Sequence, residues 1–450
     1  MTQLSSTDWK SGVRCGRSRV TLLPAGTARR RRMRLGENVE LRFPLIIIRT
    51  KRASAVFEVL GRSRFAGAFG LASAIALPVL AGVATYFLLT SLTLMLTRPE
   101  VQQVQRELGP ASYVLLPGLN PYLPLLYGWL GIVVALIVHE GAHGVVARRY
   151  NYTVRSSGIV LFLGIPIGAF VETDENEIKA GRFSEVVKIL SSGPASNAAV
   201  AVLALVGVLM VTSGLVPSIP LVVDRVVEGY PAAATGIVPG DRIVSVNGSP
   251  VYSLQDLRSS FSAAGIGGTV TVGVERGGKV LEFHVKLADI GNGTPGLGVM
   301  LRDADLLAFA SNTLQHFKSI AYSRPVALLL PPTLDFILYP FSDREICVVR
   351  EQGEVCRSVS SLYTHPMLGD SYRIVSSLLY WIWFVNFNVA IFNALPIYPL
   401  DGGQALRKLL TAFVKGAEGQ RIASAITTGV TLFFVSVIIS IILLPYLSLR

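Results

Sequence analysis

Residues 131–147 read GIVVALIVHEGAHGVVA, and this stretch combines an apolar helix with three polar side chains. It is an apolar helix interrupted near its end by His139, Glu140 and His143. Two histidines four residues apart lie about one turn apart on one helix face, so both imidazoles can reach a single metal ion. A glutamate directly after the first histidine is placed to act as general base on a water molecule at that ion.

The apolar setting of this motif distinguishes a metal site from a structural polar cluster. From Pro121 to Val146 the only other ionisable side chains are Tyr122 and Tyr127. A charge at the centre of a membrane-spanning helix costs about 2.5 kcal/mol or more, so such residues are rare there unless they have a function. The pattern favours a metal site, and a pair of structural histidines is the alternative.

The composition predicts an integral membrane protein. The 450 residues are 51% hydrophobic and 16% charged, whereas soluble domains have about 25% charged residues. Stretches long enough to cross a bilayer recur along the chain. We therefore expect a polytopic α-helical membrane protein with about five transmembrane helices. The expected spans are residues 66–96, 122–149, 186–211, 374–395 and 422–444.

The segments between the spans give weaker patterns. Residues 45–48 fit either a short strand or an interfacial segment, and residues 101–121 end in a Pro/Gly-rich run that fits a loop or strand packed at membrane depth. Residues 154–172 are predicted to form two short strands joined at 164–166. The edge of these strands could hold an extended substrate by strand addition, and a purely structural re-entrant hairpin is the alternative. We further expect an amphipathic interfacial helix over 306–330 and a basic linker over 404–421.

Residues 222–300 change character completely and are predicted to form an inserted α+β module. Short β-like runs alternate with turn sequences such as Asn247-Gly248, and residues 254–263 are predicted to be helical. The chain then divides into five expected parts. These are a basic leader over 1–65 that is partly disordered, a first membrane part over 66–215, the module over 222–300, an amphipathic helix and cysteine loop over 301–372, and a second membrane part over 373–450.

Charge predicts the topology. The net charge is +12, and residues 1–65 hold 15 Lys/Arg against 4 Asp/Glu. Nucleic-acid binding by Arg29–Arg32 is one explanation, but no recognition pattern accompanies these arginines, so we expect no nucleic-acid partner. The positive-inside rule favours a cytoplasmic leader, with 147–188 and 404–421 on the same side and the module outside. Met33 as the true start of the chain is an open alternative.

The three cysteines fit this topology. Cys15 lies in the leader, while Cys347 and Cys356 lie nine residues apart in a polar loop. They form a candidate disulfide, which requires an oxidising compartment. The charge pattern places that loop outside the cell independently.

A catalytic zinc site usually has three protein ligands and one open position. No further His, Asp or Glu follows His143 at a short spacing. The acid at a matching depth is Asp401, in the sequence NALPIYPLDGG over 393–403. Asp401 is therefore the candidate third ligand, and an acid that only ends a helix is the alternative. The third span also carries a polar residue, Asn197, after Gly193-Pro194-Ala195-Ser196.

HEGAH in one span and NALPIYPLDGG in a later one resemble the two signature motifs of the site-2 protease family, and residues 222–288 resemble a PDZ domain. This resemblance implies an intramembrane zinc metalloprotease with one Zn²⁺ per chain, held by His139, His143 and Asp401, with Glu140 as the base. It also implies that Asn393 and Asn197 contact the substrate backbone or stabilise the oxyanion. The implied substrates are transmembrane proteins in the lipid bilayer, some of them already cut by another protease, and the implied location is a prokaryotic cell membrane.

The rival class is a non-catalytic membrane protein, either a metal-binding scaffold or an ion transporter that uses intramembrane His and Asp. Glu140 separates the classes, because hydrolysis needs a carboxylate beside the first histidine and a metal-only site does not. The inverted repeats of many transporters are not evident in the five expected spans.

Overall fold

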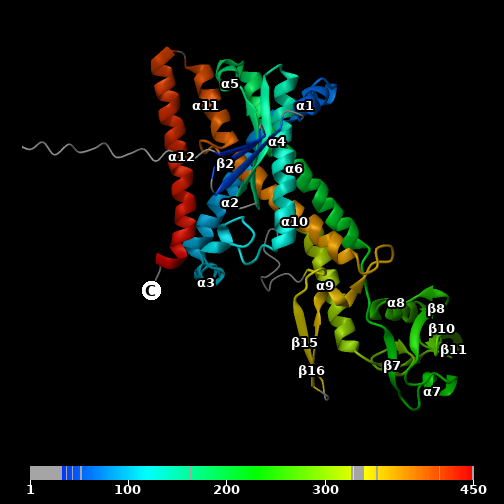
Figure 1. The fold of residues 1–450 in the computed structure, drawn as a ribbon. Coiled ribbons are helices and arrows are strands. Elements are labelled where there is room, and N and C mark those ends of the chain that lie inside the picture. Colours follow the sequence, from blue (N-terminus) through cyan, green and yellow to red (C-terminus); the bar gives the residue numbers. More distant parts are fainter. Residues whose placement is uncertain are drawn as a thin grey trace, which may run out of the picture.

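The computed structural model describes residues 33–447, apart from 37, 43, 51–52, 163–164, 326–327, 329–338, 351–352 and 415. The predicted leader up to residue 32, with Arg29–Arg32 and Cys15, lies outside the described residues. Within the described chain, a bundle of long helices carries an α+β module at one end (Figure 1).

Five helices are long and apolar enough to cross a membrane, which confirms the predicted fold class. Below, the end of the bundle that carries the helices α1 (Ala53–Gly61), α5 (Glu175–Ala180) and α11 (Asp401–Phe413) is called the α11 end, and the opposite end is called the module end (Figure 1). The five helices are α2 (Arg64–Thr97), α4 (Leu125–Arg149), α6 (Phe183–Ser213), α10 (Tyr372–Ala394) and α12 (Gly416–Leu447).

Helix α6 lies at the centre of the bundle and contacts α2, α4, α10 and α11. Small residues bring the helix backbones close together, as is usual for helix packing in membranes. A Cβ atom at Gly131 of α4 would lie 2.9 Å from the Trp381 carbonyl of α10, and one at Gly207 of α6 would lie 3.0 Å from Leu379. Helix α10 therefore packs closely against both α4, which carries the predicted metal motif, and α6.

A five-stranded antiparallel sheet lies against this bundle, with its strands in chain order. The region predicted as two short strands forms β4 (Val154–Phe162) and β5 (Ile165–Thr173). Three strands from before the first span extend the sheet, so residues 45–48 belong to a strand rather than to an irregular interfacial segment. Because β3 pairs with β4, the edge of β5 is the one that faces α4. The three added strands are β1 (Met33–Gly36), β2 (Val39–Arg42) and β3 (Leu45–Thr50).

Two predicted irregular segments are wrong in part, because both contain helices. The predicted basic linker over 404–421 is largely α11, whose Ala405 is buried while Arg407 is exposed. The polar start of 101–121 lies in α3 (Pro99–Leu108), followed by the 3-10 turn η1 (Pro110–Tyr113). Both helices are amphipathic, and each contains too many polar residues to stand out as a membrane span.

The amphipathic helix predicted over 306–330 is α9 (Ala304–Ser323), which ends earlier than expected. Leu307, Phe317 and Ala321 on it are buried in the same cluster as residues of α6, α10 and the module. The apolar face of this helix therefore packs against protein, and its place at a membrane interface stays a prediction. Much of the remainder of 306–330 falls outside the described residues.

The cysteine loop forms a hairpin of β15 (Glu345–Arg350) and β16 (Gly353–Ser358), in which Cys347 and Cys356 face each other and are joined as a disulfide. The 3-10 turn η3 (Val359–Leu362) follows it, and β17 (Tyr363–Thr364) then pairs with β6 (Val216–Pro217) after α6. The hairpin projects from the module end (Figure 1).

The module contains a sheet in the order β11-β10-β8-β7-β14, with β9 paired to β8. Helix α8 matches the predicted helix over 254–263 and begins with a capping box of Ser253 and Asp256. Asn247 and Gly248 both have positive φ, as their turn sequence predicted. The elements are β7 (Leu221–Val226), α7 (Pro231–Thr235), β8 (Arg242–Val246), β9 (Ser249–Pro250), α8 (Leu254–Ala264), β10 (Thr269–Arg276), β11 (Lys279–Lys286), β12 (Ala288–Asp289), β13 (Pro295–Gly296) and β14 (Val299–Leu301).

An ion pair between the buried Asp241 and the partly exposed Arg276 stabilises the module, and we expect Asp241→Asn to loosen it. Asp241 is fully buried, accepts two 2.6 Å hydrogen bonds from the Arg276 guanidinium and accepts a third from the Val238 N–H. An amide side chain cannot accept both guanidinium hydrogen bonds. Hydrogen exchange of the full-length variant should quicken in peptides from 221–301 and stay unchanged in α4. Equal exchange in the module would contradict this role.

The same pair predicts a pH dependence. The hydrogen bonds from Arg276 lower the pKa of Asp241. The stabilisation is therefore complete above the ordinary aspartate pKa of about 3.9 and is lost only as the pH falls through the lowered pKa. The difference in exchange between wild type and Asp241→Asn should be constant at neutral to mildly acidic pH, after correction for intrinsic rates. A difference that shrinks within that range would contradict the assignment.

Candidate metal centre

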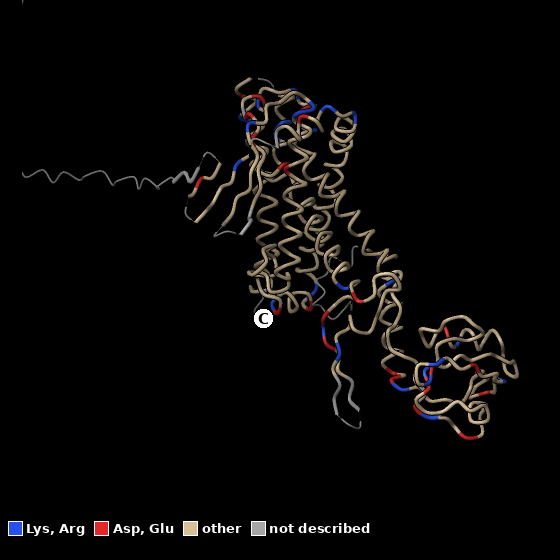
Figure 2. Tube along the Cα trace, turned by 45° about the vertical axis from the view of Figure 1, so that its right-hand side comes forward, with Lys and Arg blue, Asp and Glu red and all other residues tan. Residues whose placement is uncertain are grey.

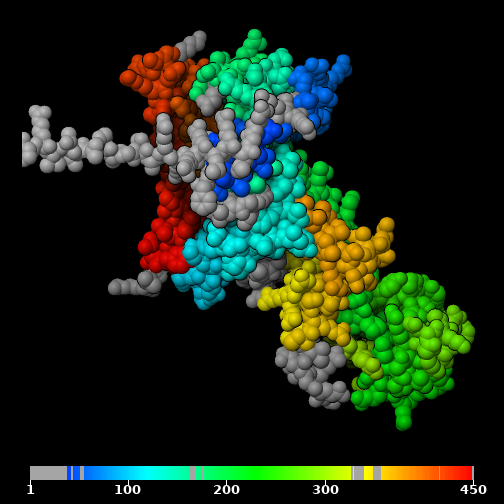
Figure 3. Space-filling view, viewed as in Figure 1, coloured from blue at the N-terminus to red at the C-terminus, as the bar shows by residue number. Residues whose placement is uncertain are grey.

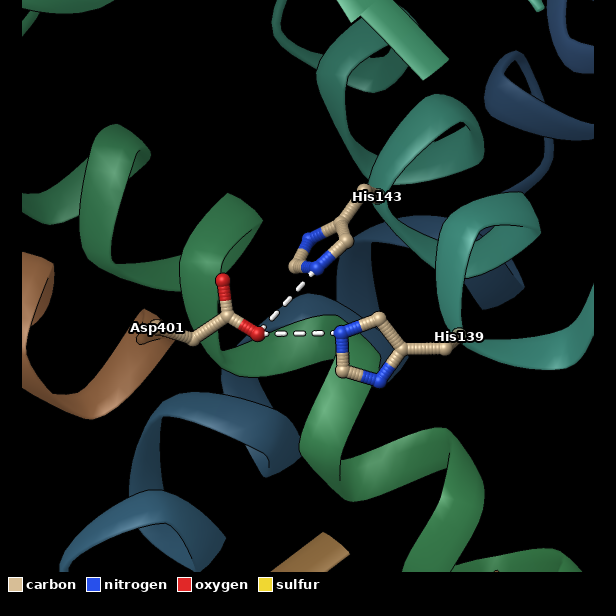
Figure 4. A group of neighbouring side chains, drawn as sticks. All are labelled: His139, His143 and Asp401. Atoms are coloured by element: carbon tan, nitrogen blue, oxygen red, sulfur yellow. Dashed lines mark hydrogen bonds and ion pairs between the residues drawn. The ribbon is translucent and has the colours of Figure 1, made fainter. Parts of the chain in front are cut away.

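Three predicted ligands from two distant parts of the chain meet inside the bundle. His139 and His143 project from α4, and Asp401 is the first residue of α11 (Figure 4). One ligand atom from each residue lies within 4.8 Å of the others. Asp401 Oδ2 is 3.0 Å from His139 Nε2 and 3.4 Å from His143 Nε2, and the three side chains are only 9–14% exposed.

Two glycines allow the start of α11 to lie at this position. A Cβ atom at Gly402 would lie 2.1 Å from the Ala394 carbonyl oxygen, and one at Gly403 would lie 2.3 Å from the Ile397 carbonyl carbon. The loop after α10 therefore folds tightly onto the first turn of α11, where only glycine fits. An acid in the first turn of a helix is also favoured by the helix dipole. The sequence Asp401-Gly402-Gly403 thus fixes the carboxylate against α4.

His143 is held by a backbone group of α6. Its Nδ1 lies 2.7 Å from the Ile189 carbonyl oxygen. A carbonyl only accepts hydrogen bonds, so Nδ1 carries the proton and, in the neutral ring, Nε2 presents its lone pair toward Asp401. A lone pair directed at a carboxylate is unfavourable unless a cation lies between them, so this orientation fits a metal ligand.

His139 is held by Asn197 of α6. Its Nδ1 lies 3.2 Å from Asn197 Nδ2, while the buried Asn197 Oδ1 has no hydrogen-bond partner. Because the two ends of an amide are interchangeable in shape, rotating the amide places Oδ1 at this position and lets it accept a proton from Nδ1. The other nitrogen, Nε2, then presents its lone pair to Asp401, as in His143.

The donor set fits a zinc-type ion. Two imidazole nitrogens and one carboxylate oxygen, each oriented by an outer hydrogen bond or a helix start, are the usual ligands of a catalytic zinc site. Soft ligands are absent from this cluster, because neither described cysteine belongs to it. Glu140, between the two histidines in sequence, is half-buried and accepts a 3.0 Å hydrogen bond from the Val171 N–H of β5.

A family model for peptidase family M50 matches residues 127–437, which span both metal motifs. The chain belongs to peptidase family M50. The predicted resemblance to site-2 proteases is therefore confirmed, and the chain is a membrane-embedded metalloprotease rather than a scaffold or transporter.

Proteins similar to this M50 peptidase occur in archaea and bacteria. An uncharacterized protein of Methanocaldococcus jannaschii is 26% identical over 60% of this chain and 68% of its own length. Zinc metalloprotease Rip1 of Mycobacterium tuberculosis is 22% identical over 71% of this chain and 94% of its own. The crystal structure of the PDZ domain of the SdrC-like protein of Listeria monocytogenes covers 19% of this chain and 90% of its own, with 32% identity and a TM-score of 0.18.

Asn197 and Asn393, the two predicted substrate contacts of the M50 peptidase, differ in their distance from the ligand cluster. Asn197 lies against His139, inside the ligand cluster. Asn393 donates to the Val389 carbonyl of its own helix, and among the described residues it makes no hydrogen bond to the cluster. Sequence reasoning missed two backbone contacts, from the Ile189 carbonyl and the Val171 N–H. No side-chain pattern could have revealed them, because any residue supplies these groups.

Gly193 of α6 lies directly against the two histidine rings, although its sequence context assigned it no role. A substitution at this position tests the site. A Cβ atom at Gly193 would lie 2.4 Å from His143 Nε2 and 2.6 Å from His139 Nε2. We expect Gly193→Ala to displace both ligand nitrogens and to lower metal affinity by about 10–100-fold or more, the usual effect of disturbing the outer shell of a metal site. Bound metal is measured after dialysis against a graded chelator.

The matched control is Gly141→Ala, in the motif itself. A Cβ atom there meets nothing within 4 Å. This variant should keep its metal. Equal metal content in the two variants would mean that the tight approach of α6 does not define the site.

Proposed function

We propose that this M50 peptidase is an intramembrane zinc endopeptidase that hydrolyses peptide bonds within or near transmembrane segments. His139, His143 and Asp401 would hold one Zn²⁺, and Glu140 would be the general base. The observation that carries the proposal is the convergence of the three ligand atoms within 4.8 Å among apolar helices. When bound by these three residues, the ion would supply Lewis-acid chemistry, namely polarisation of the scissile carbonyl and a lower pKa for a water molecule.

Glu140 supplies the proton transfers. Its carboxylate follows the first ligand on α4, where it can take a proton from the attacking water and deliver it to the leaving amine. In the resting geometry this carboxylate is hydrogen-bonded to the Val171 N–H. The base is therefore held by the strand that borders the site.

The free edge of β5 suits an unwound substrate. A transmembrane helix hides its amides in internal hydrogen bonds, so the cut segment must become extended. The Val171 N–H points away from β4 and toward the site, and Ala169 shares that side because strand groups alternate. A carbonyl of the substrate strand that accepts the hydrogen bond of the Val171 N–H would displace Glu140 from it and so free the Glu140 carboxylate for catalysis. Pairing and activation would then be a single event.

Asn197 would orient His139 rather than contact substrate. Asn197→Asp keeps an acceptor for the His139 Nδ1 proton, whereas Asn197→Leu keeps the approximate shape and removes the acceptor. We expect zinc affinity, measured by competition with a chromogenic chelator, to fall about 10–100-fold in Asn197→Leu and to change little in Asn197→Asp. Wild-type affinity in Asn197→Leu, with impaired cleavage alone, would instead support the oxyanion role.

The decisive experiment compares wild type with Glu140→Gln. Both purified proteins are incubated with a panel of single-span substrates, and cleavage and bound zinc are measured together. We expect about one zinc on each protein and cleavage by wild type alone. Cleavage by the variant at the wild-type rate would exclude Glu140 as the base, and absence of zinc from both proteins would contradict the site.

The proposed orientation places the α11 end in the cytoplasm and the module end outside, in a prokaryotic cell membrane. In its support, Lys and Arg gather at the α11 end of the bundle, while its middle is almost free of charge (Figure 2). The disulfide hairpin lies at the opposite end, where an oxidising compartment would preserve it.

Thiol labelling tests this orientation. In a Cys15→Ser background, Cys347→Ser leaves Cys356 as the single thiol, on an exposed hairpin. A membrane-impermeant maleimide should label it in intact cells. Labelling only after permeabilisation would reverse the topology.

The substrates would be membrane proteins, some already trimmed by another protease. The PDZ-like module at the module end would then act as a size filter or bind the new end of a trimmed substrate (Figure 1). Deleting 222–300 should increase cleavage of full-length substrates relative to trimmed ones. Unchanged selectivity would remove this role from the module.

A further inference from the structure

A cavity at the α11 end has a lining that the peptidase reaction does not use. Its volume is about 680 Å³, within the range of about 300–1,000 Å³ typical of ligand sites. It is bounded by α5, the start of α6, the loop before Asp401, α11 and Gln420 of α12. Asp401 and the two histidines do not line it. Figure 3 shows the segments around α5 (green) and around α11–α12 (orange) side by side at this end.

All charged side chains that line the cavity are basic. Lys179, Arg407 and Lys408 line the cavity, and none of its lining residues is acidic. Lys408 Nζ donates a 2.9 Å hydrogen bond to the Lys179 carbonyl oxygen, so this side chain bridges α11 and α5. Partial burial lowers the pKa of Lys408. The Arg407 guanidinium lies 5.3 Å from the centre of the Tyr398 ring. The cavity therefore suits an anion.

Apolar side chains share the same lining. Phe183, Val186 and Leu190 of α6 form one wall, and Phe183 is partly exposed. The cavity also lies where the spans α6 and α12 begin, which is the level of a bilayer surface. A ligand that is anionic at one end and apolar at the other fits this combination.

We propose that this cavity binds the phosphate headgroup of an anionic phospholipid of the leaflet at the α11 end. The glycerol and upper acyl chain would lie on Phe183 and Leu190, and the phosphate among Lys179, Arg407 and Lys408. Basic pockets next to membrane helices recognise lipid headgroups in this way. A substrate peptide fits less well, because the cytoplasmic flanks of membrane spans carry excess Lys and Arg, which these three cations would repel.

This site would act as a clamp between α5 and α11. The Lys408 bridge already joins these helices, and α11 begins with Asp401. A phosphate shared between Lys179 of α5 and Arg407 of α11 would stabilise the same arrangement. Lipid binding therefore stabilises the folded protein whether or not zinc or substrate is present.

The test is thermal unfolding of the full chain in mixed micelles, with phosphatidylglycerol or phosphatidylcholine added. The cavity variant is Lys179→Gln/Arg407→Gln, and both side chains are exposed, so the fold should survive. The matched control is Arg62→Gln/Arg64→Gln, which removes two exposed cations outside the cavity. Arg62 lies just before α2 in an exposed ion pair with Glu58, and Arg64 is the first residue of α2. Inorganic phosphate and glycerol phosphate serve as soluble headgroup probes.

We expect phosphatidylglycerol, and not phosphatidylcholine, to raise the unfolding midpoint of wild type and of the control by the same amount. The cavity variant should lose at least half of that rise. An equal rise in all three proteins would mean a diffuse surface effect and would overturn the site. A full rise with inorganic phosphate alone would overturn the lipid as its ligand, and no rise in wild type would overturn the proposal entirely.

Discussion

The structure depends on one electrostatic constraint, the burial of the Asp401 carboxylate among apolar helices. A carboxylate with little access to water must be paired or bind a cation, because burial of an unpaired charge is very costly. Here its oxygen faces the Nε2 atoms of His139 and His143. Both rings are oriented from behind by α6, through the Ile189 carbonyl and Asn197. One cation shared by the three groups would satisfy them all, and this is the reason that we propose for the meeting of two distant segments here.

Close backbone approach makes this arrangement rigid. Gly193 lets α6 lie directly against the histidine nitrogens, while Gly402 and Gly403 let α11 start against the preceding loop. At each position a methyl group would overlap its neighbours, so the close packing that positions the side chains depends on glycine. Beside them, β5 presents a backbone N–H to Glu140. The proposed ligands and base thus lie on the packed helices α4 and α11 rather than on loops, and a paired strand contacts the base.

Much of this site was predictable, since each ligand needs a particular side chain. His139, Glu140 and His143 follow from helical spacing, and Asp401 from the need for a third ligand within a charge-free region. The five spans follow from length and hydropathy. Helices α3 and α11 were missed because they are short and polar, so they have neither the length nor the hydropathy of a membrane span. The partners of Glu140 and His143 were not predictable, because they are backbone groups of β5 and α6 and depend on tertiary packing.

Zinc K-edge X-ray absorption tests the central claim most directly, because it reports the atoms bound to the metal. For purified wild type we predict only nitrogen and oxygen neighbours at about 2.0–2.2 Å, including two imidazoles. In Asp401→Cys a sulfur neighbour at about 2.3 Å should appear while zinc remains bound. Zinc retained by Asp401→Cys with an unchanged spectrum would show that Asp401 is not a ligand and would contradict the account.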